Sequence, residues 1–151
     1  MLPGMKADMN TMTTKIQPAG NLQELSKLSR ETVRPILLLF SQTYCEACHR
    51  IKDEILNPML LNEDDTSRVI MREMLIDEGQ TFIDFDGSQK ETRELFVDYD
   101  MVVTPTLILL DHTGKQLGDK LIGLNTVELY GWYLENAIVY ARSLILKSGI
   151  H

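Results

Sequence analysis

The sequence has few of the residues that hold a fold together through covalent or metal bonds. Its 151 residues include two cysteines and three histidines. Both cysteines lie in one short segment, Cys45-Glu-Ala-Cys48, and a disulfide between them would close too small a loop to restrict the unfolded chain much. A chain of this length can bury a sufficient core without such a bridge. We therefore expect the two thiols to serve chemistry rather than stability.

Positive charge and long apolar runs are also scarce. The chain has 15 Lys and Arg residues against 22 Asp and Glu residues, a formal net charge of −7. This balance argues against a nucleic-acid-binding surface and against a polybasic membrane patch. Residues 1–20 lack the apolar core of a secretory signal, and residues 126–146 contain too many polar side chains for a membrane span. We expect one globular domain over residues 21–151, preceded by a flexible tail over residues 1–20.

The pattern of apolar residues predicts alternating helices and strands. Asn21 with Glu24 is a helix-start signature, and the run ILLLF at 36–40 is typical of a central strand that is buried on both faces. A strand–helix–strand unit followed by a hairpin predicts an α/β fold, in which helices flank both faces of a mixed central β-sheet. In chain order, we expect helices at 21–31, 45–57, 90–99 and 125–147, and strands at 36–40, 69–77, 102–110 and 116–122.

The Cys-x-x-Cys pair lies where this arrangement would make a thiol reactive. Cys45 follows a buried strand and begins a helix, which we expect to end or kink at Asn57 because Pro58 follows. Unpaired backbone N–H groups and the helix dipole favour a thiolate there, and such pairs reach pKa values of ~3.5–7.5. The thiolate is the attacking species in disulfide exchange. Cys48 lies one turn later on the same face, so it can attack the mixed disulfide and release the partner.

Two other interpretations of the cysteine pair stay open. The cysteines could form half of a zinc site, but such sites usually take four ligands and the sequence has no second Cys-x-x-Cys. A Cys2His2 site completed by His49 and His112 would need an unusual geometry. They could also be inert buried thiols, although their position between a strand and a helix favours a redox role. We expect no metal at this site.

The segments LLLFSQTYCEACHRIK (37–52) and DMVVTPTLILLDHTGK (100–115) resemble the thioredoxin-fold family. The resemblance covers about residues 22–147 and is strongest to bacterial periplasmic thioredoxin-like thiol:disulfide reductases, including the thioredoxin of sulfur-oxidation clusters. It implies that Cys45 is the exposed nucleophile and that Cys48 is the buried resolving cysteine.

The same resemblance implies a role for the segment Val-Thr-Pro-Thr at 103–106. Pro105 would be a cis-proline that faces the disulfide. Cis X–Pro bonds are uncommon and usually serve a purpose. Thr104 would present its backbone to a substrate chain in a strand-like contact. Without the Cys-x-x-Cys, the simpler interpretation of Pro105 is the start of an edge strand in trans.

The sequence departs from thioredoxin at three places around the cysteines. Glu46 and Ala47 replace the Gly-Pro pair, which influences the reduction potential. Leu39 stands where thioredoxin has a buried aspartate that accepts a proton, and Glu73 stands where thioredoxin has a lysine beneath the disulfide. We hypothesise that Glu73 takes over proton transfer for Cys48 as a base; the alternative is a solvated strand glutamate.

The resemblance implies an enzyme, a thiol–disulfide oxidoreductase, and favours a reductase of protein disulfides. Such an enzyme needs no cofactor beyond the Cys45–Cys48 couple and acts on a disulfide-bearing protein. It commonly receives electrons from a membrane thiol transporter. An oxidase or isomerase of the same fold is the near alternative. A thioredoxin-like metal carrier is a more distant one, because those usually have three residues between the cysteines.

Location and assembly follow less directly from the residues. A Cys-x-x-Cys pair functions in the periplasm and in the cytoplasm. The resemblance favours the periplasm, with the cytoplasm as the alternative. The helix expected at 125–147 is apolar nearly all round, which indicates deep burial or a partial interface. Burial against the sheet is the simpler interpretation, so we expect a monomer rather than a dimer.

Overall fold

A five-stranded mixed sheet forms the centre of the computed structural model, which describes residues 14–149. The strand order is β1-β3-β2-β6-β7, with β1, β3 and β2 parallel and with β6 and β7 antiparallel to their neighbours. A separate hairpin pairs β4 with β5. The strands are β1 (Gln17–Pro18), β2 (Ile36–Ser41), β3 (Ile70–Leu75), β4 (Thr81–Ile83), β5 (Gln89–Glu91), β6 (Thr106–Leu110) and β7 (Leu121–Ile122).

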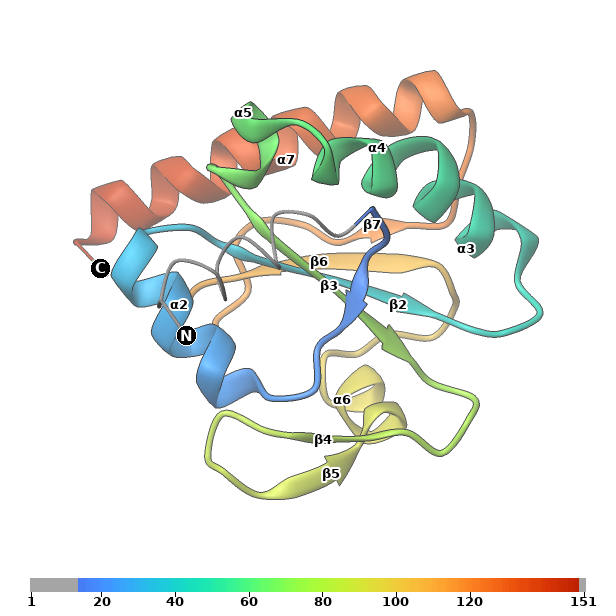
Figure 1. The fold of residues 1–151 in the computed structure, drawn as a ribbon, viewed down its shortest axis with the longest axis horizontal. Helices are drawn as coiled ribbons and strands as arrows, with labels where there is room; N and C mark the ends of the chain where they lie inside the picture. The colour runs from blue at the N-terminus through green and yellow to red at the C-terminus, as the bar shows by residue number, and fades with distance from the viewer. Residues whose placement is uncertain (1–13, 150–151) are drawn as a thin grey trace, which may run out of the picture.

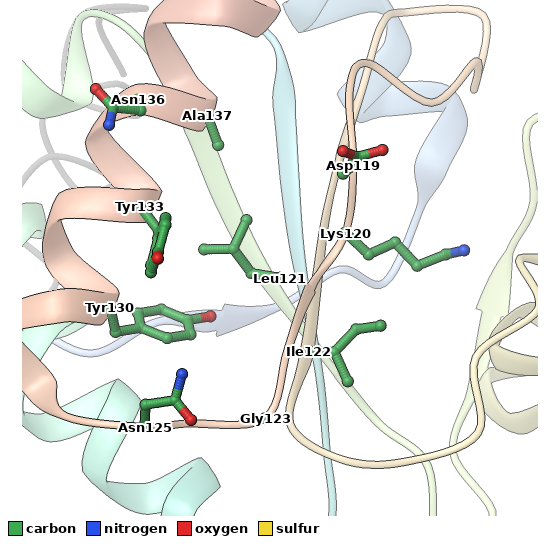
Figure 2. A pocket seen from close by; sticks show the side chains of 10 residues that line it. All are labelled: Asp119, Lys120, Leu121, Ile122, Gly123, Asn125, Tyr130, Tyr133, Asn136 and Ala137. Carbon is green, nitrogen blue, oxygen red and sulfur yellow. The ribbon is translucent and has the colours of Figure 1, made fainter.

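Helices cover both faces of this sheet, which confirms the predicted fold class (Figure 1). One face carries the long C-terminal helix and the helix that follows β2, and the other face carries α2 and α6. The helical elements are α2 (Leu22–Thr32), α3 (Glu46–Ile51), the π-helical segment η1 (Lys52–Leu56), α4 (Asn57–Leu60), α5 (Glu63–Thr66), α6 (Thr92–Asp98) and α7 (Val127–Ser148).

The central strand β2 explains why the sheet needs cover on both sides. Leu37 and Leu39 pack into the apolar cluster beneath α7, whereas Leu38 and Phe40 pack into the cluster beneath α2 and α6. All of these side chains are fully buried. Because successive side chains of a strand point to opposite faces, a strand buried on both faces has a continuous apolar run.

Helix α7 buries only one of its apolar faces. The buried face packs on the sheet, and the outer face leaves large apolar side chains exposed, including Trp132 at 62%. Burial against the sheet therefore explains the apolar residues on the inner face of α7 but not those on its outer face. Thr126, rather than Asn125, caps its first turn, and Gly149 ends it in a left-handed conformation that favours glycine. Within residues 14–149, no helix combines the length and the apolarity needed to cross a membrane.

The segment before α2 differs from the expected tail. Gln17 and Pro18 pair with β3, and Ile16 and Ala19 are buried. Because residues 1–20 are mostly polar, nothing in the sequence indicated that Ile16 and Ala19 are buried. The folded domain therefore begins earlier than predicted. Residues 1–13 of the predicted tail lie outside the described part of the chain.

Pro58 does not end the helix that begins after Cys45. The chain instead makes a π-helical turn, in which the N–H of Asn57 bonds to the carbonyl of Lys52, and continues to Leu60. Proline lacks an N–H and its ring crowds the carbonyl four residues earlier. A widened turn before Pro58 changes that register, so the helix passes the proline without ending at Asn57.

Other element boundaries differ from the expected ones in ordinary ways. Residues 63–66, which lie outside the expected helices and strands, form α5, which begins with the Asn62 side chain accepting the N–H of Asp64. The β4–β5 hairpin lies between the strand expected to end at 77 and α6, which begins at Thr92. Strand β6 begins at Thr106 rather than at 102, which leaves residues 101–105 as a loop beside the cysteines.

Candidate functional site

The two cysteines form a disulfide at the junction of β2 and α3. Cys45 is the N-cap of α3, and its Sγ accepts the backbone N–H of Cys48 at 3.1 Å. Cys45 is partly exposed, whereas Cys48 has no exposed surface. An attacking sulfur can therefore reach this disulfide through Cys45 but not through Cys48.

The loop that presents Cys45 is held from two sides. The carboxylate of Asp77, just after β3, accepts the backbone N–H of Thr43 at 3.0 and 3.1 Å and also its hydroxyl at 3.1 Å. The ring Nε2 of His49 lies 2.8 Å from the carbonyl oxygen of Thr43. These contacts fix the loop while Tyr44, beside the nucleophile, remains 98% exposed.

The loop before β6 faces the disulfide. The Thr104–Pro105 peptide bond is cis, and the hydroxyl oxygen of Thr104 lies 3.8 Å from the Sγ of Cys45. The carbonyl oxygen of Pro105 accepts the N–H of Gly123, which ties the loop to the end of β7. The backbone N–H and C=O of Thr104 form no hydrogen bond with any residue from 14 to 149. They are thus free to pair with an extended chain.

A charged pair lies on the sheet face that α3 and η1 cover. The carboxylate of Glu73 accepts the hydroxyl of Ser41 and pairs with the ammonium of Lys52 at 2.9 Å. Both charged side chains are less than one-fifth exposed, and Lys52 lies one turn beyond Cys48 on the same helix. Glu73 also stands opposite the fully buried Leu39 in the β2–β3 register. It is therefore not a solvated strand glutamate.

Residues 22–138 match the family of thioredoxin-like domains, which accounts for more than half of the chain. The chain belongs to the thioredoxin-like family. A thioredoxin-like fold with a Cys-x-x-Cys disulfide supports thiol–disulfide oxidoreductase chemistry at Cys45 and Cys48.

Solved structures of thioredoxin-like proteins share the fold. The long form of spinach chloroplast thioredoxin f aligns with a TM-score of 0.58 at 18% identity, covering 90% of this chain and 93% of its own. DsbH oxidoreductase gives 0.58 at 22% identity, over 82% and 85%. Mitochondrial thioredoxin 3 of Saccharomyces cerevisiae gives 0.53 at 21% identity, over 82% and 92%. A comparison with curated protein sequences gave no match.

In this thioredoxin-like site, the residues singled out from the sequence fall into two groups. The structure brings the cysteine pair, Cys45 and Cys48, together with Thr104 and Pro105, although the two pairs are far apart in the chain. Glu73 forms no hydrogen bond or ion pair with either cysteine; its described partners are Ser41 and Lys52. Among residues 14–149, no three potential metal-ligating side chains cluster.

Sequence reasoning missed several polar residues of the site. Lys52 could have been found, because its spacing of four from Cys48 places both on one helix face. Asp77 and Gln42 offered no such signal, since their partners Thr43 and Thr104 are defined by the folded loops.

Proposed function

We propose that this protein reduces disulfide bonds in other proteins by dithiol–disulfide exchange. The Cys45 thiolate attacks one sulfur of the substrate disulfide, and the other substrate sulfur leaves as a thiolate. The Cys48 thiolate then attacks the Cys45 sulfur of the mixed disulfide, which releases the second substrate thiolate. Two electrons pass to the substrate, and the enzyme is left with the Cys45–Cys48 disulfide.

The observation that carries this direction is the small number of groups that would stabilise a thiolate at Cys45. Besides the disulfide bond, the described contacts of its sulfur are the backbone N–H of Cys48 at 3.1 Å and the hydroxyl of Thr104 at 3.8 Å. His49 is directed to the Thr43 carbonyl instead. Glu46 adds a carboxylate beside the nucleophile, and a like charge disfavours a thiolate. A strong disulfide oxidant requires a strongly stabilised reduced form, which this environment does not favour.

The reduction potential of the Cys45–Cys48 couple tests the direction. We expect a value of ~−270 to −200 mV, the range of thioredoxin and glutaredoxins, when the purified protein is equilibrated with dithiothreitol or glutathione buffers. Catalysed reduction of insulin disulfides by dithiothreitol should accompany it. A potential near about −120 mV, like that of a strong periplasmic oxidant, would instead assign the oxidase direction to the same residues.

Substrate and electron supply follow from the same proposal. The unpaired backbone of Thr104 and the neighbouring Pro105 would hold an extended segment of the substrate protein across the disulfide. Three apolar side chains close to these residues, Tyr44, Val102 and Ile122, are largely exposed and would contact that segment. We also propose that a membrane thiol transporter restores the dithiol by the same exchange and that the reaction takes place in the periplasm; both proposals rest on the resemblance to periplasmic thioredoxin-like reductases.

Glu73 is proposed to handle the proton of Cys48 when that thiol attacks the mixed disulfide. The carboxylate lies on the α3-covered face but already pairs with Lys52 and Ser41, so transfer would pass through a water. We expect Glu73→Gln to slow resolution of a mixed disulfide about tenfold, below the ~10²–10⁴ of direct general-base catalysis. Rapid-quench measurement of release checks this, with Glu54→Gln, on the same segment η1 as Lys52, as the control. An unchanged release rate would remove Glu73 from the mechanism.

A further inference from the structure

The hydroxyl of Thr104 has two neighbours that compete for one hydrogen. It donates to the side-chain oxygen Oε1 of Gln42 at 2.6 Å, and the sulfur of Cys45 lies 3.8 Å away. Gln42 comes from the loop after β2, whereas Thr104 comes from the loop before β6. Both side chains are partly buried. The contact thus joins two loops of the site at the nucleophile.

In the disulfide form, the Thr104 hydroxyl donates its hydrogen to Gln42 rather than to Cys45. The 2.6 Å separation is that of a short, well-formed hydrogen bond, while a disulfide sulfur is a weak acceptor. A thiolate changes this balance, because hydrogen bonds to an ionised acceptor are roughly twice as strong as neutral ones. The preferred partner of the hydroxyl therefore depends on the redox state of Cys45.

We propose that Gln42 is a positioning residue that holds the Thr104 hydroxyl beside Cys45 and releases its hydrogen to the thiolate when the disulfide is reduced. An amide carries both an acceptor and a donor. Gln42 accepts from Thr104 in the disulfide form. In the reduced form, its NH₂ group donates to the Thr104 oxygen while the Thr104 hydroxyl donates to Cys45. The three groups then form one directed chain, which strengthens the last bond.

The switch rests on the proposed exchange at Cys45 but not on its direction. A dithiol reductant such as dithiothreitol supplies two electrons and two protons to the Cys45–Cys48 bond and becomes a cyclic disulfide. The Cys45 thiol then loses its proton to water. No covalent bond to Gln42 or Thr104 forms or breaks; only hydrogen bonds change partners.

The test is a titration of the reduced protein, followed by the ultraviolet absorbance of the Cys45 thiolate. Gln42→Glu supplies acceptors only at neutral pH, so it should keep the hydroxyl hydrogen and raise the titration midpoint by about one pH unit or more. Thr104→Val removes the donor and should raise the midpoint by about the same amount. Thr104→Ser keeps the hydroxyl and should restore the wild-type value.

A double-mutant cycle separates the switch from a structural role. Gln42→Leu should raise the midpoint in the wild-type background and have no effect in the Thr104→Val background. Gln89→Glu, on the separate β4–β5 hairpin, is the matched charge control and should leave the midpoint unchanged. Equal effects of Gln42→Leu in both backgrounds, or no effect in either, would overturn the proposal even if insulin reduction is intact. Absence of disulfide reduction by the wild type, with the cycle as expected, would overturn only the proposed function.

Discussion

Replacing Cys48 with serine should leave the protein covalently attached to its substrate. Cys45 is partly exposed and remains able to attack a disulfide, while the fully buried Cys48 is the group placed to release the product. A serine hydroxyl does not attack a disulfide at neutral pH, because the thiolate is the reactive species. We expect a mixed disulfide that survives denaturation without reductant and disappears on addition of dithiothreitol. Non-reducing electrophoresis with mass spectrometry of the adduct measures it.

Cys45→Ser is the matched control, because it removes the other sulfur of the same pair. It should abolish insulin reduction completely and form no adduct, since the remaining Cys48 thiol has no exposed surface. The reverse result, an adduct on Cys48 in the Cys45→Ser protein, would exchange the roles of the two cysteines. Insulin reduction at the wild-type rate by both variants would remove thiol exchange from the proposed function.

Ile138→Ala, in α7, should produce a large loss of stability. Ile138 has no exposed surface and belongs to the apolar cluster between α7 and the sheet. Truncating a buried isoleucine to alanine removes apolar contacts and leaves a cavity, at a cost of ~2–5 kcal/mol. Set against a typical total of ~5–15 kcal/mol, this would visibly lower the midpoint of urea unfolding.

The neighbouring residue supplies a control with nearly the same change in chemistry. Val139 is 53% exposed on the outer face of α7, so Val139→Ala should alter the free energy of unfolding by only about 0.5 kcal/mol. Both variants keep the helix and change one aliphatic side chain. If the two unfolding curves shift by the same amount, the packing of α7 described here is wrong.

The parts of the fold and site that could be predicted are those written in contiguous sequence. The run ILLLF required cover on both faces, and the Cys-x-x-Cys after it required a strand-to-helix junction. Pairing of Gln17 and Pro18 with β3 could not be predicted, because two residues are too few to show a strand period. The π-helical turn before Pro58 was hidden for a different reason: proline specifies a disturbance of the helix but not its form.

Contacts between loops that are far apart in the chain could not be predicted within the site either. Gln42 and Thr104 are separated by 62 positions, and neither residue type signals the other. Glu73 was singled out by alignment with the family, yet its pairing with Lys52 and Ser41 depends on how η1 lies on the sheet. Residue types near the cysteines predicted the reaction, whereas their hydrogen-bond partners required the folded chain.

The outer face of α7 gives the protein an intrinsic optical probe. Trp132 is the only tryptophan of the chain, is 62% exposed and meets the ring of Tyr133 edge-on, with centroids 5.1 Å apart. It does not belong to the loops around the disulfide. Its fluorescence will therefore resemble that of an indole in water and will carry little information on the redox state. Emission will instead move to shorter wavelength when another molecule covers this face of the helix.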